Sequence, residues 1–166
     1  MATIKQAYAA SVSFALDLHA TQMITAAARE SDYVSNVTDA YIDVIGQLKI
    51  KLSTTGAPAS DKQVNVYAYG GETTSTGAWS FTDNATGTNA QVTLRSPTNF
   101  RLVQTIQTPD ASDVAYRSPP FSIAAAFGGV MPRHWGVVVE NRTNIQFASS
   151  SGLHAATYTG ILSTSA

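Results

Sequence analysis

Cysteine is absent from this 166-residue chain, and charged residues are scarce. The missing thiols exclude cysteine catalysis, disulfide frameworks, iron–sulfur clusters and cysteine-ligated zinc. The 10 basic and 11 acidic side chains make up 13% of the residues and leave a net charge of −1. A chain with so little positive charge lacks the clustered basic surface that nucleic acid requires. We therefore expect no direct nucleic-acid partner.

Long apolar runs are also missing. No uninterrupted apolar stretch approaches the roughly 20 residues that cross a bilayer, so we expect no membrane partner. Residues 1–10 include Lys5 but no apolar segment of the kind found in signal peptides, so we expect no export signal there. The length suits one domain with a buried core. We expect a single β-sandwich domain over 1–166.

What the chain does contain is an alternation of apolar and polar residues with period two, interrupted by frequent turn signals. This pattern predicts roughly eight to ten short strands and no regular alternation of strands with helices. It is typical of an all-β protein, a jelly roll or a related antiparallel β-sandwich, with at most one short helix, expected at 22–31. The expected strands cover 12–18, 40–52, 64–69, 78–82, 91–95, 99–107, 134–140, 145–148 and 154–162.

Two segments leave local questions open. Gly46 separates two runs of opposite parity within 40–52, which predicts a bulge or bend there. Beyond Gly46 the apolar residues alternate with Lys49 and Lys51, which predicts one solvated, cationic face. The segment 121–127 (FSIAAAF) fits either a strand or a single helical turn.

Catalytic and metal-binding patterns are weak. His19, His134 and His154 lie far apart in the sequence, and only Asp17 with His19 offers two ligands on one strand face. The G-x-S-x-G pattern of a nucleophile elbow is absent, and the segment SSSGLH at 149–154 is typical of a polar loop. We expect a protein that is not an enzyme and that has no cofactor and no metal site.

Two pairs of aromatic residues suggest a different kind of site. Tyr67 and Tyr69 share one parity of an expected strand, and Trp79 and Phe81 share one parity of the next. Exposed rings in this arrangement would form a platform on which a glycan stacks, whereas buried rings would be ordinary cross-strand packing. Both interpretations stay open at this point.

The segment FGGVMPRHWG at 127–136 predicts a structural corner. Gly128 and Gly129 permit tight backbone geometry, and Pro132 fixes φ and favours an extended conformation for the residue before it. Trp135 then begins a strand whose valines at 137–139 are expected to be buried on both faces. We expect this corner to be packed without a ligand.

The C-terminal third and the opening of the chain together resemble small virion structural proteins of tailed bacteriophages. The resemblance lies in FGGVMPRHWGVVVENRTN at 127–144, YTGIL at 158–162 and MATIKQAY at 1–8, and extends to RES at 29–31 and the long strand at 40–52. It implies a jelly-roll or related module. It also implies a role as a capsid cement or decoration protein, assembled in the host bacterial cytoplasm and located in the virion. The alternative is a tail-associated or glycan-binding host-attachment module.

The same resemblance implies partners. They are the chain itself, as a homo-oligomer with a trimer favoured over a dimer, and the major capsid protein or tail proteins of the particle. The terminal segments 1–10 and 163–166 carry Lys5 as their only charged side chain. We expect them to be disordered in a monomer and to act as arms that lie over a neighbour. A monomer with frayed ends is the alternative.

Overall fold

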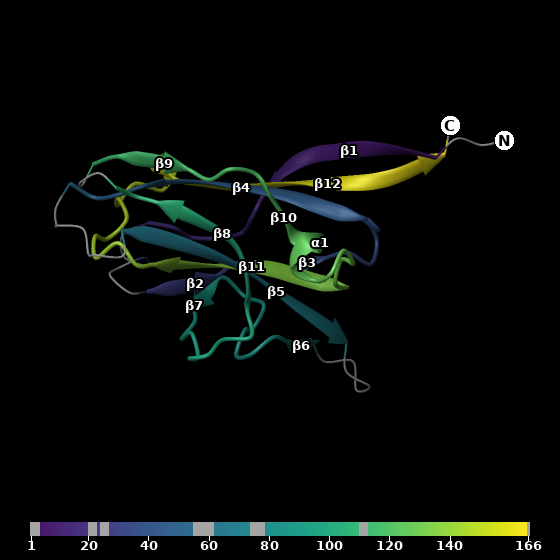
Figure 1. The fold of residues 1–166 in the computed structure, drawn as a ribbon, viewed down its shortest axis with the longest axis horizontal. Coiled ribbons are helices and arrows are strands. Elements are labelled where there is room, and N and C mark those ends of the chain that lie inside the picture. The colour runs from purple at the N-terminus through teal and green to yellow at the C-terminus, as the bar shows by residue number, and fades with distance from the viewer. Residues whose placement is uncertain are drawn as a thin grey trace.

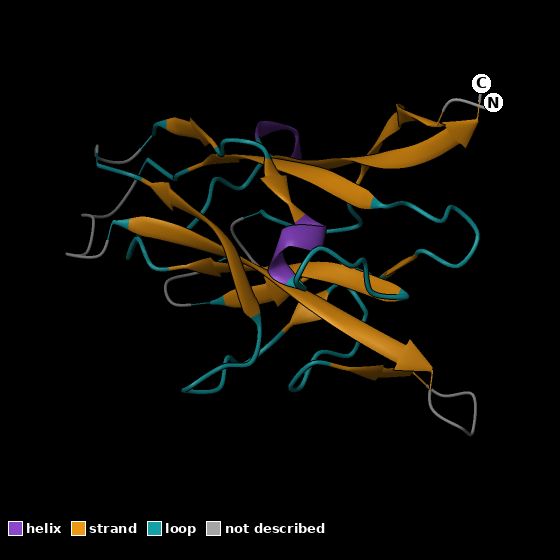
Figure 2. Cartoon of the chain, turned by 45° about the vertical axis from the view of Figure 1, so that its right-hand side comes forward, coloured by secondary structure: helices purple, strands orange, loops and turns teal. Residues whose placement is uncertain are grey.

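A computed structural model describes residues 4–19, 23, 27–54, 62–73, 79–109 and 113–165, with only the backbone described at Thr73 and Trp79. Within these residues two antiparallel β-sheets face each other across an apolar core (Figure 1). The fold is therefore an all-β sandwich, as the strand pattern predicts. Figure 2 shows the two layers of strands, with the helical turn α1 (Ile123–Ala126) between them.

Sheet A has five strands in the described part of the chain. The strand order is β1-β12-β4-β10, and β9 also pairs with β4; every pairing is antiparallel. The strands are β1 (Ile4–Ser13), β4 (Asp43–Lys51), β9 (Ala115–Arg117), β10 (Phe121–Ser122) and β12 (Ala155–Ser165). The chain therefore places its first and last strands side by side at one edge of this sheet.

In the described part of the chain, sheet B has seven strands. The strand order is β6-β5-β11-β2-β7, with β3 also paired to β11 and β8 also paired to β5. The strands are β2 (Ala28–Glu30), β3 (Val34–Ser35), β5 (Gln63–Thr73), β6 (Trp79–Phe81), β7 (Ala90–Gln91), β8 (Arg101–Gln107) and β11 (His134–Asn141). β11 lies at the centre, and its run of valines is fully buried, as expected for a strand covered on both faces.

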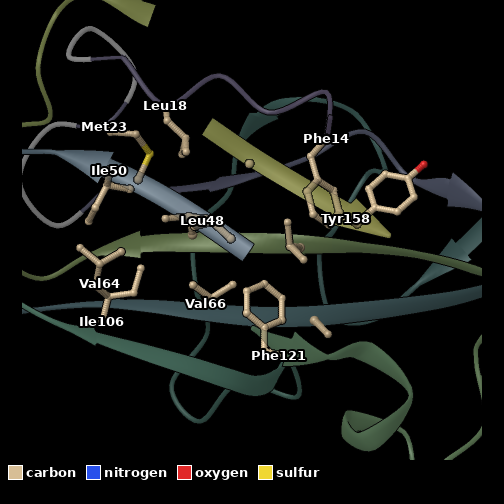
Figure 3. Close-up of a cluster of buried hydrophobic side chains, with 14 of the residues drawn as sticks. Phe14, Leu18, Met23, Leu48, Ile50, Val64, Val66, Ile106, Phe121 and Tyr158 are labelled. Carbon is tan, nitrogen blue, oxygen red and sulfur yellow. The ribbon is translucent and has the colours of Figure 1, made fainter. Parts of the chain in front are cut away.

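The main core lies between the two sheets. Alternate residues of β4 and β12 point into it from sheet A, and Val64, Val66, Val137 and Val139 point into it from sheet B. Figure 3 shows this cluster, with Phe14 and Tyr158 close together at one end. A second, smaller cluster lies on the opposite face of sheet B, around Tyr69, Phe100 and Val138.

The expectation of a bulge or bend at Gly46 is wrong. β4 runs without interruption from Asp43 to Lys51, and its even-numbered residues point inward throughout. A side chain at Gly46 would collide with the ring of Phe121, because a Cβ there would lie 2.5 Å from Phe121 Cε2. The glycine is needed for close approach of that ring. The alternation of buried Leu48 with the more exposed Lys49 confirms the cationic outer face expected beyond Gly46.

The helix expected at 22–31 is wrong where the structure describes it. Ala28–Glu30 is strand β2, which pairs with β11 on one side and β7 on the other. Residues 20–22 and 24–26 lie outside the described residues. The one described α-helical segment is α1, preceded directly by strand β10, so FSIAAAF contains a short strand followed by a helical turn. Ser122 caps α1 by accepting a hydrogen bond from the Ala125 amide at 3.0 Å.

The N-terminal strand begins earlier than the pattern at 12–18 predicts. β1 ends at Ser13, and the following segment contributes buried Phe14 and Leu18 without strand pairing. The expectation that the terminal segment is a disordered arm is wrong for 4–10, because these residues belong to β1, whose residues 4–8 pair with the end of β12. The reason is backbone hydrogen bonding, which the two terminal segments supply to each other.

The terminal strands project beyond the sandwich. β4 pairs with β12 only between Ala155 and Ile161, whereas β1 continues along β12 to Ser165. Residues 4–8 and 161–165 therefore form a two-stranded ribbon, called here the terminal ribbon. Figure 1 shows β1 and β12 extending together past β4.

Candidate functional site

The predicted aromatic platform lies on the outer face of sheet B, where a long loop covers part of it. Tyr67 and Tyr69 share that face, as their parity predicts, but Tyr69 is 0% exposed. Its hydroxyl donates to the Ser31 carbonyl at 2.7 Å, and its ring meets Phe81 edge-on at 5.5 Å. Burial raises the pKa of Tyr69 well above the ordinary tyrosine value. The prediction of a glycan platform is therefore wrong for Tyr69.

Tyr67 is half-buried and belongs to a polar cluster of its own. Its hydroxyl donates to Glu140 Oε2 at 2.9 Å, and the Asn65 amide donates to the same oxygen at 3.0 Å. Burial, followed by the nearby Glu140 carboxylate, raises the pKa of Tyr67. Phe81 is half-buried against Tyr69, and the side chain of Trp79 lies outside the described residues. The structure does not bring Tyr67, Tyr69 and Phe81 together into one exposed plane.

The loop between β6 and β7 is fastened over this face by a buried carboxylate. Glu30 is 1% exposed and accepts hydrogen bonds from the Thr86 amide, the Thr86 hydroxyl and the Gly87 amide. A buried carboxylate is costly unless such donors surround it. These bonds explain why a glutamate occupies β2, an interior strand of sheet B. They also explain why the aromatic face beneath the loop is closed.

The predicted corner has the expected backbone geometry. Gly128 and Gly129 both have positive φ, at 74° and 90°, and follow directly on α1 and its C-cap. The Gly129 amide donates to the Ala124 carbonyl at 2.8 Å, which closes the helical turn. Pro132 packs over Gly70 of β5, where an added Cβ would lie 2.9 Å from Pro132 Cγ.

Trp135 is fully buried at the start of β11. Its ring lies edge-on to Phe14 at 5.8 Å and to Tyr158 at 5.2 Å. These three aromatic residues connect sheet B to the chain that leaves β1 and to β12. The corner therefore leads into the core.

His154 lies at a hollow of about 220 Å³, whose lining also includes Phe14, Asp17 and Ser151. His19 Nε2 lies 2.9 Å from Asp17 Oδ2, so the expected proximity of these two side chains is confirmed, although on a loop rather than a strand. No group of three metal-ligating residues gathers anywhere in the described ranges.

His154 is held by the backbone through both ring nitrogens. The Lys51 amide donates to Nδ1 at 3.3 Å, so the Nε2 nitrogen carries the proton and donates to the Ala148 carbonyl at 2.9 Å. Burial, together with the nearby His19 and Lys49, lowers the pKa of His154. An imidazole engaged at both nitrogens does not activate Ser151, so the hollow lacks a paired base and nucleophile.

Sequence reasoning missed the exposed apolar residues of the terminal ribbon. Ile4 is 78% exposed and Tyr8 is 74% exposed. They share one face, because they pair with Ser165 and Ile161, both of the parity opposite to that of core-facing Tyr158. The signal in the sequence was their equal parity within IKQAY, a segment that contains a single charge.

A second unpredicted surface lies at the opposite edge of sheet A. A shallow groove of about 250 Å³ separates β8 from β10 and α1, and its lining includes Leu102, Val103, Phe121 and Ala126. Leu102 is among the most exposed large apolar residues of the chain. Both exposed surfaces are suited to contact with another macromolecule.

Comparison with known proteins finds no match. No protein-family model matches the chain, and no curated protein and no solved structure matches it either. Over the residues described here, no helix is long and apolar enough to cross a membrane.

Proposed function

We propose that this chain is a structural protein of a bacteriophage virion, specifically a cement protein that decorates the capsid. The resemblance of 127–144 and 1–8 to virion proteins of tailed phages supports the proposal. The observation that carries it is the terminal ribbon, because a projecting pair of strands with exposed Ile4 and Tyr8 offers contact surface to neighbouring subunits.

Cement proteins act by adding interface. A subunit that bridges neighbouring capsomers buries surface that outward pressure would otherwise separate, and a stable contact buries roughly 1,200–2,000 Å². Many copies make modest contacts strong collectively. The small number of charges suits this role, because few ions lose their hydration when the surface is covered.

The proposed partners are other copies of this chain and the major capsid protein. A homo-oligomer, with the trimer expected from the resemblance, would be added to the shell in the bacterial cytoplasm and stay in the virion. A tail position is the alternative placement, with tail proteins as partners. The glycan-binding alternative has less support, since the buried Tyr69 removes the centre of its platform.

Quantitative mass spectrometry of purified virions tests the proposal. The copy number of this chain is measured relative to the major capsid protein of the same particles. Copies in the hundreds are expected for a cement protein. A few dozen copies would overturn the capsid placement in favour of the tail, and absence from washed particles would overturn the virion role altogether.

A further inference from the structure

The outer edge of β1 is open. In the described part of the chain β1 pairs with β12 alone, so backbone amide and carbonyl groups along its other side have no strand partner. Natural edge strands are commonly protected by charges, proline, shortness or bulges. β1 contains one charged residue, Lys5, and no proline, and its register shift falls after Tyr8. The regular part of this edge is therefore Ile4–Tyr8.

The large apolar residues of this edge are at its two ends and on the same face. Ile4 and Tyr8 are the two most exposed large apolar residues of the described chain, and Gln6 lies between them on that face. Lys5 and Ala7 occupy the other face. On this face, the large apolar residues are therefore placed symmetrically on either side of Gln6. A second copy of the same segment, running antiparallel, presents the same arrangement.

Symmetry limits how two copies of β1 can pair. Two identical antiparallel edges related by a twofold axis keep the same face on the same side, so the axis passes midway between one residue and the same residue of the other copy. Centring on Lys5 would place two lysines directly opposite each other, which is destabilising. Centring on Ala7 would place Tyr8 opposite Gln6 and Ile4 opposite Ala10, beyond the register shift.

A register centred on Gln6 avoids the problems of the other two registers. Ile4 of one copy then lies opposite Tyr8 of the other, twice over, as aromatic–aliphatic cross-strand pairs. Lys5 lies opposite Ala7, so the only charged residues are kept apart. We infer that a second copy of this chain pairs with β1 in this register and joins the two five-stranded sheets A into one continuous sheet.

The inferred contact is small and is expected to be weak. It comprises five residues from each copy, well below a standard interface, so pairing depends on concentration. A twofold contact makes a dimer, and the trimer expected from the sequence would need a different surface. The inference concerns the free protein and does not depend on the proposed virion role.

Cysteine cross-linking tests the inference, because the protein has no cysteine of its own. In the Gln6-centred register the two Gln6 Cα atoms lie about 4.5–5.5 Å apart, within disulfide range. The variant Gln6→Cys, incubated under mild oxidation, is expected to form a disulfide-linked dimer that a reductant dissolves.

Ser163→Cys is the matched control. Ser163 is exposed and lies directly opposite Gln6 on β12. In the inferred dimer two Ser163 positions are separated by three strand spacings, about 14 Å, which a disulfide does not span. Cross-linking at least tenfold faster for Gln6→Cys than for Ser163→Cys is the expected result. Equal cross-linking rates for the two variants would overturn the inference, because they would show that β1 does not pair with a second copy in this register.

Charge at position 7 tests the register independently. Ala7→Glu places a carboxylate opposite Lys5 of the second copy, and Ala7→Lys places a like charge there. Sedimentation at several concentrations is expected to show severalfold tighter dimerisation for Ala7→Glu than for Ala7→Lys. The same dimerisation constant for both variants would overturn the Gln6-centred register.

Discussion

At the scale of single residues, close approach between a glycine and an aromatic ring recurs in this sandwich. A Cβ on Gly136 of β11 would lie 2.4 Å from both Cζ and Oη of Tyr69. Tyr69 cannot move away easily, because its hydroxyl is bonded to the Ser31 carbonyl and its ring is buried. The glycine therefore allows the tyrosine to cross the central strand of sheet B.

Gly136→Ala tests this contact. The added methyl group displaces the Tyr69 ring, and we expect the free energy of unfolding to fall by about 1–3 kcal/mol, measured by urea denaturation. Gly152→Ala is the control, because a Cβ there meets nothing within 4 Å and its change should stay within about 0.5 kcal/mol. Equal stability of the two variants would show that the Tyr69 ring is free to shift.

At the scale of elements, the terminal ribbon and the sandwich have different roles. The ribbon contains the exposed Ile4 and Tyr8, whereas Phe14, six residues after Tyr8, already packs against Tyr158 at 4.9 Å. A two-stranded ribbon without a facing layer contributes little to stability. The boundary between a surface for partners and the structural core therefore lies between Tyr8 and Phe14.

Deleting residues 1–8 should leave the sandwich folded. β12 keeps its pairing with β4, and near-ultraviolet circular dichroism should retain the signal of packed aromatic residues. Deleting residues 1–14 removes Phe14 from contact with Trp135 and should cost about 3–5 kcal/mol. If the shorter deletion also abolished the near-ultraviolet signal, the ribbon would be part of the core.

At the scale of the whole molecule, two histidines couple stability to pH. Burial lowers the pKa of His134 and of His154 below the ordinary value of 6.5. The unfolded chain therefore binds protons at a higher pH than the folded chain does. Their contribution to stability is complete above the unfolded pKa and is lost as the pH falls from about 6.5 toward the folded values.

Urea denaturation between pH 7.5 and 5 measures this coupling. We expect the free energy of unfolding to decrease as the pH falls through this window. In His154→Gln the decrease should be shallower, because one group with a lowered pKa is gone. An unchanged slope in that variant would show that His154 does not contribute to the pH dependence.

The alternation along the chain by itself determined the fold class and the inward side of most long strands. Leu48 and Lys49 illustrate this, since one is buried and the other faces outward, as their positions predict. The inward side of a strand can be predicted locally, because the pleat of a β-strand places successive side chains on opposite faces in any sheet topology. Residue type likewise permits the positive φ angles of Gly128 and Gly129, which fit the tight backbone geometry expected there.

Only the tertiary structure decided which faces are covered. Ala28–Glu30 has helix-forming residues but becomes a strand, because β11, β7 and the loop donors at Thr86 surround it. Tyr69 is closed off by a loop beyond its own strand, whereas Tyr8 is open because it lies on the face of sheet A that is turned away from the core. Burial and strand ends depend on segments distant in the sequence, and a local pattern contains no information on where those segments lie.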